Sequence, residues 1–181
     1  MKKILLFVFL QFTFISFSQK NTSKLNQQDK QELTKLVAQF DAVLKKYYPD
    51  SKIPYKDYIS ELEKQQVNPY ITKEKQSLKL YKNLKSTGTF KKIWSKGSDG
   101  THKFDYNGPF YQYFVESLPN NQAKNSLEEF KKVRDMGMDL NIYVLVSALN
   151  TYLNDKDYAS VGVKAVIAVL FYYDIIAFFD K

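Results

Sequence analysis

His102 is the single histidine of the sequence, and hydroxyl and carboxyl side chains stand close to it in the chain. Ser95, Ser98, Asp99 and Asp105 supply, by type, a nucleophile, a base and an orienting acid. A catalytic triad is defined by geometry, however, and its members normally converge from separate elements. The GSDG stretch around Ser98 also lacks the GxSxG elbow of many serine hydrolases. We therefore interpret His102 as a solvated histidine in a polar turn.

Neighbouring carboxyl groups occur at three places and could support glycan hydrolysis. Glycosidases use two carboxyl groups roughly 5 to 10 Å apart, one of which an apolar setting keeps protonated. The three pairs are Glu61 with Glu63, Glu128 with Glu129, and Asp155 with Asp157. All of them fall on predicted exposed faces or loops, so a carboxylate-dependent glycan hydrolase is only the third of our functional hypotheses. The sequence predicts no catalytic residues, no metal ligands and no cofactor.

Lysine and aromatic side chains form the densest feature of the sequence. Lys75, Lys79 and Lys82 share one side of a predicted helix, opposite an apolar side. Aromatic residues crowd the segment that follows, and such rings often anchor a protein partner, although core packing is their more common role. The candidate binding residues are Lys75, Lys79, Lys82, Lys91, Lys92, Trp94, Tyr106, Phe110, Tyr111 and Tyr113.

The charge of the chain is positive and unevenly distributed. The formal net charge is +8, with +9 over residues 20–103 and −3 over residues 104–181. Arg134 is the only arginine, and lysine suits diffuse attraction better than bidentate phosphate recognition. We therefore expect an acidic protein or an anionic envelope component as partner, with a membrane surface as an alternative and nucleic acid excluded. There is no cysteine, so disulfides and thiolate chemistry are excluded.

The first eighteen residues have the layout of a secretory signal peptide. Met1–Lys3 is positively charged, residues 4–15 are apolar, and Ser16 and Ser18 occupy the small-residue positions of a cut before Gln19. The apolar run is shorter than the roughly 17 to 25 residues of a spanning helix. We expect a signal peptide over residues 1–18, with an uncleaved anchor as the alternative, and a periplasmic or secreted domain over residues 19–181.

Helical periodicity dominates the rest of the chain. An apolar row predicts a helix from about Asn26 to Tyr47, and Thr72 and Ser126 are predicted to begin later helices as N-caps. Residues 89–108 are punctuated by glycine, which predicts a small hairpin or structured loop. The sequence therefore predicts an all-α, single-domain bundle of about six or seven helices with this one irregular segment.

The last helix raises the question of whether it crosses a membrane or fills a core. Residues 161–179 are apolar except for Lys164 and Asp174. A helix that is apolar on all sides is typical of the centre of a bundle, and we expect it to pack as an antiparallel hairpin against the helix before it. Asp174 is then a buried polar candidate, which needs a donor from a tyrosine hydroxyl or the backbone, or else a shifted pKa.

We expect an exported, non-enzymatic binding protein of the cell envelope, of the inhibitor or immunity type, that holds an acidic protein. The alternative is a secreted membrane-active protein whose C-terminal apolar helical hairpin inserts into a bilayer. The sequence carries no signal for an oligomeric state.

Overall fold

The computed structural model describes residues 25–138 and 140–180, so the predicted signal peptide lies outside the described residues. Its elements are α1 (Gln27–Tyr47), α2 (Pro54–Glu63), the 3₁₀ turn η1 (Ile71–Lys73), α3 (Lys75–Lys85), α4 (Phe90–Ile93), β1 (Trp94–Lys96), β2 (His102–Phe104), α5 (Pro109–Ser117), α6 (Asn121–Asp135), α7 (Tyr143–Tyr152), the 3₁₀ turn η2 (Asp157–Ala159), α8 (Val161–Ile167), the π-helical η3 (Ala168–Tyr173) and α9 (Asp174–Phe179). The all-α fold is confirmed. The predicted irregular segment contains α4 and an antiparallel hairpin that pairs Trp94 with Phe104.

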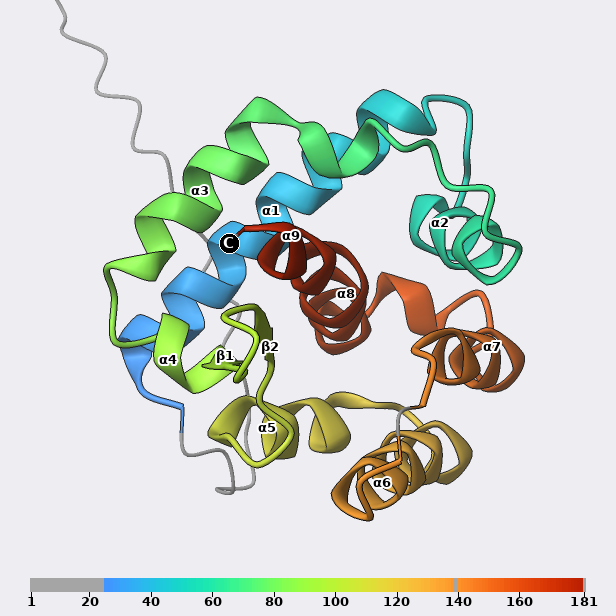
Figure 1. Ribbon diagram of the computed structural model, residues 1–181. Coiled ribbons are helices and arrows are strands. Elements are labelled where there is room, and N and C mark those ends of the chain that lie inside the picture. Colours follow the sequence, from blue (N-terminus) through green and yellow to red (C-terminus); the bar gives the residue numbers. More distant parts are fainter. Residues whose placement is uncertain (1–24, 139, 181) are drawn as a thin grey trace, which may run out of the picture.

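The helix of α8, η3 and α9 runs through the middle of the bundle, and the other elements surround it (Figure 1). Val161–Phe179 is 19 residues long with a mean hydropathy of 1.9, so by length and composition it could cross a membrane. In this structure 67% of its most apolar stretch is buried by the rest of the protein. The prediction of a core helix agrees with this arrangement.

The packing partner predicted for this helix was wrong. The preceding helix, α7, packs mainly against α2 and α6, whereas α8 and η3 contact α1 and α8 contacts α5. The turn η2 between α7 and α8 redirects the chain from the ring into the centre (Figure 1). A central helix is shared among many neighbours, so its position follows from the whole set of apolar faces and not from the adjacent helix alone.

Helix α1 illustrates how the ring encloses the centre. Asn26 caps it, since its side chain accepts a hydrogen bond from Asp29 N while Asp29 accepts one from Asn26 N. Its buried Phe40 stacks on Tyr172 of η3 at 4.4 Å between ring centroids. Tyr58 of α2 donates a hydrogen bond of 2.6 Å to the carbonyl oxygen of Phe171. That bond satisfies a backbone acceptor inside the π-helical segment, where the regular α-helical pattern is interrupted.

Two predicted helix starts were wrong. Helix α6 begins at Asn121, where Asn120 accepts a hydrogen bond from Ala123 N, and Ser126 lies inside the helix with its hydroxyl donating to Gln122 O. Thr72 lies within η1, and α3 begins after Glu74 without a side-chain cap. At α6 several Ser and Asn residues stand close together, and local preference alone does not decide which of them is the cap. At α3 none of the nearby polar side chains caps the helix.

Candidate binding surface

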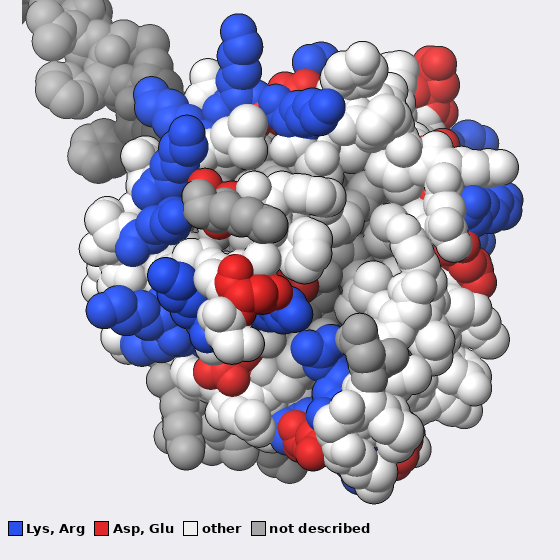
Figure 2. Space-filling view, viewed as in Figure 1, with Lys and Arg blue, Asp and Glu red and all other residues white. Residues whose placement is uncertain are grey.

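Four of the predicted lysines lie free on one surface of the molecule. Lys75, Lys79 and Lys82 of α3 and Lys91 of α4 are all exposed, and we call them the lysine surface. Figure 2 shows basic side chains gathered over α3 and over the region of α4 and the hairpin. Within the described chain, none of these four forms an ion pair or a hydrogen bond through its side chain.

The lysines of α3 are like charges at helical spacing. Helix α3 carries four lysines, Lys85 included, and no acidic residue. Lysines spaced three or four residues apart on a helix repel one another. Lys75 also lies in the first turn, where the helix dipole disfavours a positive charge. Of the four, only Lys85 has a partner in the described structure, the carboxylate of Asp180. An anion bound along α3 would relieve this repulsion.

A groove of about 450 Å³ runs beside the lysine surface, between α1 and α3. Its lining is mostly polar and consists of Lys35, Ala38, Gln39, Gln76, Lys79, Leu80 and Asn83. Gln39 contacts the buried hydroxyl of Ser77 through its amide nitrogen, at 3.3 Å. Lys79 belongs to both features, so amide groups able to donate and accept hydrogen bonds adjoin the positive charges.

Four of the five aromatic residues of the predicted site were wrongly assigned, because their side chains form part of the core. Trp94, Tyr106, Phe110 and Tyr113 are at most 8% exposed and cannot contact a partner in this structure. The apolar area of such rings favours burial, and Phe104 and Phe114 stack between them at 5.5 Å. Tyr111 is half-buried, with Lys131 placed over its ring. The lysines are therefore exposed, whereas most of the aromatic residues are buried.

Lys92 was also wrongly assigned to the binding surface. Its ammonium group lies 2.6 Å from Oδ2 of Asp29, which is 1% exposed. The Thr89 hydroxyl donates to the other carboxylate oxygen at 2.9 Å. Burial opposes ionisation of Asp29, but the bonds from Lys92, Thr89 and the Asn26 backbone outweigh it and lower its pKa. The ion pair of Lys92 with Asp29 thus links α4 to the start of α1.

Asp174, the buried polar candidate, does lie largely buried and is hydrogen-bonded. Its Oδ1 accepts from the indole N–H of Trp94 at 3.0 Å and from the backbone N–H of Phe104 at 2.8 Å. The strand amide of Phe104 is a backbone donor, as expected, whereas the second donor is the indole of Trp94 and not a tyrosine hydroxyl. Burial raises the pKa of Asp174 to about 6, and the two hydrogen bonds offset only part of that effect. Asp174 joins the hairpin to the central helix.

Both aspartates of the candidate catalytic group have structural partners. Asp99 accepts hydrogen bonds from Thr101, and Asp105 accepts one from Asn107 N. The interpretation of His102 as a solvated turn residue was wrong: it lies on β2, edge-on to the ring of Phe90, and burial lowers its pKa. The described residues contain no group of three or more acidic or histidine side chains that could hold a metal ion.

Residues of the three carboxylate pairs also form hydrogen bonds or ion pairs with their neighbours. Glu61 accepts a hydrogen bond from Tyr48 and Glu63 accepts one from Asn150. Glu129 forms an ion pair with Lys132, and Asp155 forms one with Lys56. Hydrogen bonds from Ser147 and Asn150 lower the pKa of Glu63, whereas a general acid must be kept protonated.

Two exposed aromatic residues escaped the sequence interpretation. Phe178 and Phe179 at the end of α9 are 45% and 74% exposed, and their rings meet at 5.4 Å. The ion pair of Lys85 with Asp180 places them beside the C-terminal end of α3. In the sequence they continue the apolar stretch of the last helix, and no local signal indicates that their side chains are exposed while the earlier ones are buried.

No family model, curated protein or solved structure matches this chain.

Proposed function

We propose that the protein is a non-enzymatic binding protein, exported to the cell envelope, that holds an acidic protein on its lysine surface. An inhibitor or immunity protein that blocks an acidic target is the role this surface suits best. The observation that carries the proposal is the row of uncompensated lysines on α3, Lys75, Lys79 and Lys82. Their mutual repulsion lowers the stability of the free protein and is relieved when an acidic surface binds.

The neighbouring groove supports a protein partner. Amide side chains on its walls, such as Gln76 and Asn83, can exchange hydrogen bonds with a backbone or with carboxamides. Lysines draw an acidic partner in from a distance and set its orientation, while the polar groove supplies short-range specificity. Interfaces of this type associate fast at low salt and are weakened by added salt.

Charge reversal tests the proposal. The triple variant Lys75→Glu, Lys79→Glu and Lys82→Glu, immobilised beside the wild type, is exposed to envelope extract at low salt. We expect acidic proteins retained by the wild type to be lost from the variant and to elute from the wild type as salt rises. The control, Lys64→Glu, Lys132→Glu and Lys156→Glu, changes the net charge equally at exposed sites on other elements. Equal retention by all three proteins would remove the lysine surface as the binding site.

A second candidate, a membrane-active protein, is favoured by two observations on the central helix. The exposed Phe178 and Phe179 adjoin the basic end of α3, and Val161–Phe179 has the length and hydropathy of a spanning helix. Aromatic rings beside lysines bind the interface of an anionic bilayer. Co-sedimentation with anionic vesicles, compared between the wild type and Phe178→Ser with Phe179→Ser, tests it. Lysine-dependent retention of proteins without vesicle binding would favour the first candidate.

A further inference from the structure

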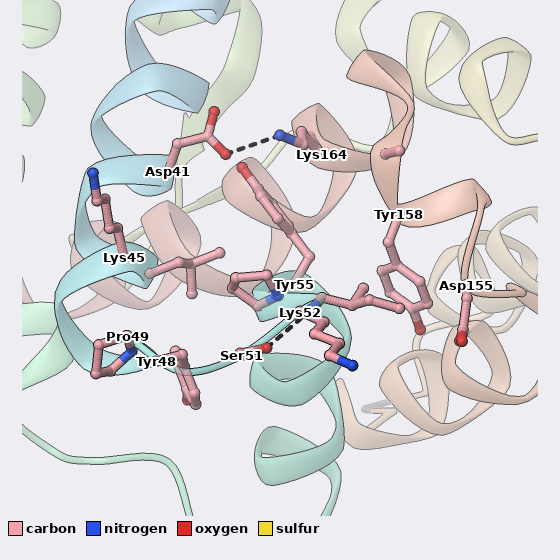
Figure 3. A pocket seen from close by; sticks show the side chains of 14 residues that line it. Asp41, Lys45, Tyr48, Pro49, Ser51, Lys52, Tyr55, Asp155, Tyr158 and Lys164 are labelled. Atoms are coloured by element: carbon pink, nitrogen blue, oxygen red, sulfur yellow. Dashed lines mark hydrogen bonds and ion pairs between the residues drawn. The ribbon is translucent and has the colours of Figure 1, made fainter.

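The groove between α1 and α3 differs from another pocket of the described chain, whose polar side chains satisfy one another. That pocket, of about 440 Å³, lies between α1, α2 and α8. In it the ammonium of Lys164 lies 3.1 Å from Oδ1 of Asp41, and the Tyr55 hydroxyl points toward the same ion pair (Figure 3). Burial and the hydrogen bond to the Asp41 carboxylate raise the pKa of Tyr55. These three side chains therefore link the helices around the pocket and leave no charge for a ligand.

At the groove the positive charge is in excess. Glu32 contacts Lys35, which lines the groove, at 2.8 Å, and Glu74, directly before α3, contacts Lys46 at 2.6 Å. The acidic side chains beside the groove are thus already paired. The three lysines of the lysine surface on α3 have no acidic partner within the described residues. A partner that lies in the groove must therefore supply the carboxylates.

The three lysines run parallel to the groove. Lys75, Lys79 and Lys82 are four and three residues apart, so they form one stripe that spans about 10 Å along the axis of α3. Each lysine is followed directly by a residue that lines the groove, namely Gln76, Leu80 and Asn83. A charged stripe and an uncharged stripe therefore lie next to each other along two turns of α3.

A helix fits this surface better than an extended segment. Helices α1 and α3 lie side by side (Figure 1), and the groove between two packed helices accepts the side-chain ridge of a third. Ala38 on the α1 wall is exposed and small, which permits a close approach. An extended segment would bring unpaired backbone groups against helices whose own backbone groups are already bonded, whereas a helix satisfies its own.

We propose, resting on the proposed function, that the element of the acidic partner held in this groove is an amphipathic α-helix. Carboxylates spaced three and four residues apart on that helix pair with the lysine stripe of α3. A neighbouring stripe of small or amide side chains lies in the groove against Ala38, Gln76 and Leu80. Because the carboxylates and the lysines then repeat with the same period, all the ion pairs form together only when the partner segment is helical.

Three synthetic peptides of roughly 20 residues, long enough to be helical in isolation, test the proposal. All carry equal numbers of glutamates among alanines and glutamines. In the first the glutamates form one stripe, in the second they are spread around the helix, and in the third two central alanines are replaced by proline, which breaks the helix. Calorimetry at low salt measures the affinities, and amide shifts of residues 35–39 and 76–83 locate the site.

We expect the striped peptide to bind one-to-one and about tenfold more tightly than either control peptide. Absence of binding by the striped peptide, or a control peptide of equal affinity, would overturn the proposal, because attraction by charge alone does not depend on helicity or on the stripe.

A variant places the helix in the groove. Ala38→Leu adds bulk to the groove without changing the charge, and we expect it to weaken binding of the striped peptide about tenfold. The control is Ala159→Leu, the same substitution at an exposed position of η2. Unchanged affinity of the Ala38→Leu protein would contradict a helix in the groove. If acidic proteins were still retained through the lysines while the three peptides bound equally, the helix would be rejected and the proposed function would stand; retention that did not depend on the lysines would reject both.

Discussion

Two acidic residues hold the segment of α4 and the hairpin against the rest of the protein, and they do so in opposite ways. Asp29 binds the beginning of the segment through Thr89 and Lys92, whereas Asp174 binds its strands through Trp94 and Phe104. Asp29 contacts a cation directly, and its pKa is lowered. Asp174 receives neutral donors, and burial raises its pKa to about 6. Burial alone therefore does not decide whether a carboxyl group stays charged; the nature of its donor does.

The two groups contribute to stability in different pH ranges. The stabilisation due to Asp29 is present above its unfolded-state pKa and is lost as the pH falls through its lowered folded-state pKa. Asp174 binds a proton more tightly in the folded than in the unfolded protein, so stability falls as the pH rises from about 4 to about 6. The contribution of Asp29 to stability therefore persists in mild acid, whereas mild acid increases the contribution of Asp174.

The largest expected effect on stability follows from removing the Lys92 ammonium group beside Asp29. Lys92→Met leaves the buried Asp29 without its ion-pair partner, and we expect a loss of about 3 kcal/mol in the free energy of unfolding at neutral pH. The pKa of Asp29 should rise, so that acidification narrows the difference from the wild type. Urea unfolding across the pH range measures both effects. Lys91→Met, at the exposed neighbouring position, should change stability by less than about 0.5 kcal/mol. Equal losses in the two variants would show that the Asp29 contact is unimportant.

Replacing the charge of the second site should stabilise the protein. Asp174→Asn keeps an oxygen able to accept from both Trp94 and Phe104, because both bonds end on Oδ1. We expect a gain of about 2 kcal/mol above pH 7, and loss of the decline in stability between about pH 4 and pH 6. Chemical denaturation at several pH values tests this. Asp174→Leu is the contrasting variant, since it leaves both donors unpaired and should be destabilising. If the Asp174→Asn protein kept the pH profile of the wild type, the raised pKa of Asp174 would be disproved.

The smallest effect concerns a remote charge. Lys103 is exposed on β2, and its charge lowers the pKa of Asp174 slightly. Lys103→Gln should raise that pKa by a fraction of a unit and change stability by less than about 0.5 kcal/mol. The carboxyl resonance of Asp174, followed by NMR during a pH titration, reports the shift. Salt at about 1 M should abolish the difference from the wild type, because exposed charges are screened; a difference that persists would indicate direct contact.

The sequence was sufficient for the fold class because helical periodicity is a local signal. The apolar row of α1, the proline that opens α5 and the glycines of the hairpin each predict their element without reference to the others. The capping residue of α6 and the partners of the central helix were not predicted correctly. Those depend on competition between similar local choices and on contacts between residues far apart in the chain.

Which of the candidate side chains are exposed could be predicted only in part, for the same reason. Exposed lysines on α3 follow from the position of its apolar face. Lys92 resembles Lys91 in every local respect, and only the fold brings Asp29 to it across 63 positions of sequence. The same holds for Trp94, which meets Asp174 across 80 positions. No sequence pattern predicts the pocket between α1, α2 and α8, because its walls come from separate elements.

The helix at the centre of the bundle follows in sequence all the described helices that surround it. While the chain is being made, the earlier helices therefore have apolar faces and nothing yet to cover them. Folding must wait until residues 161–179 have emerged. Most native contacts of that helix join residues distant in sequence, and such contacts slow folding. A polypeptide lacking this stretch should therefore remain unstructured and prone to aggregate.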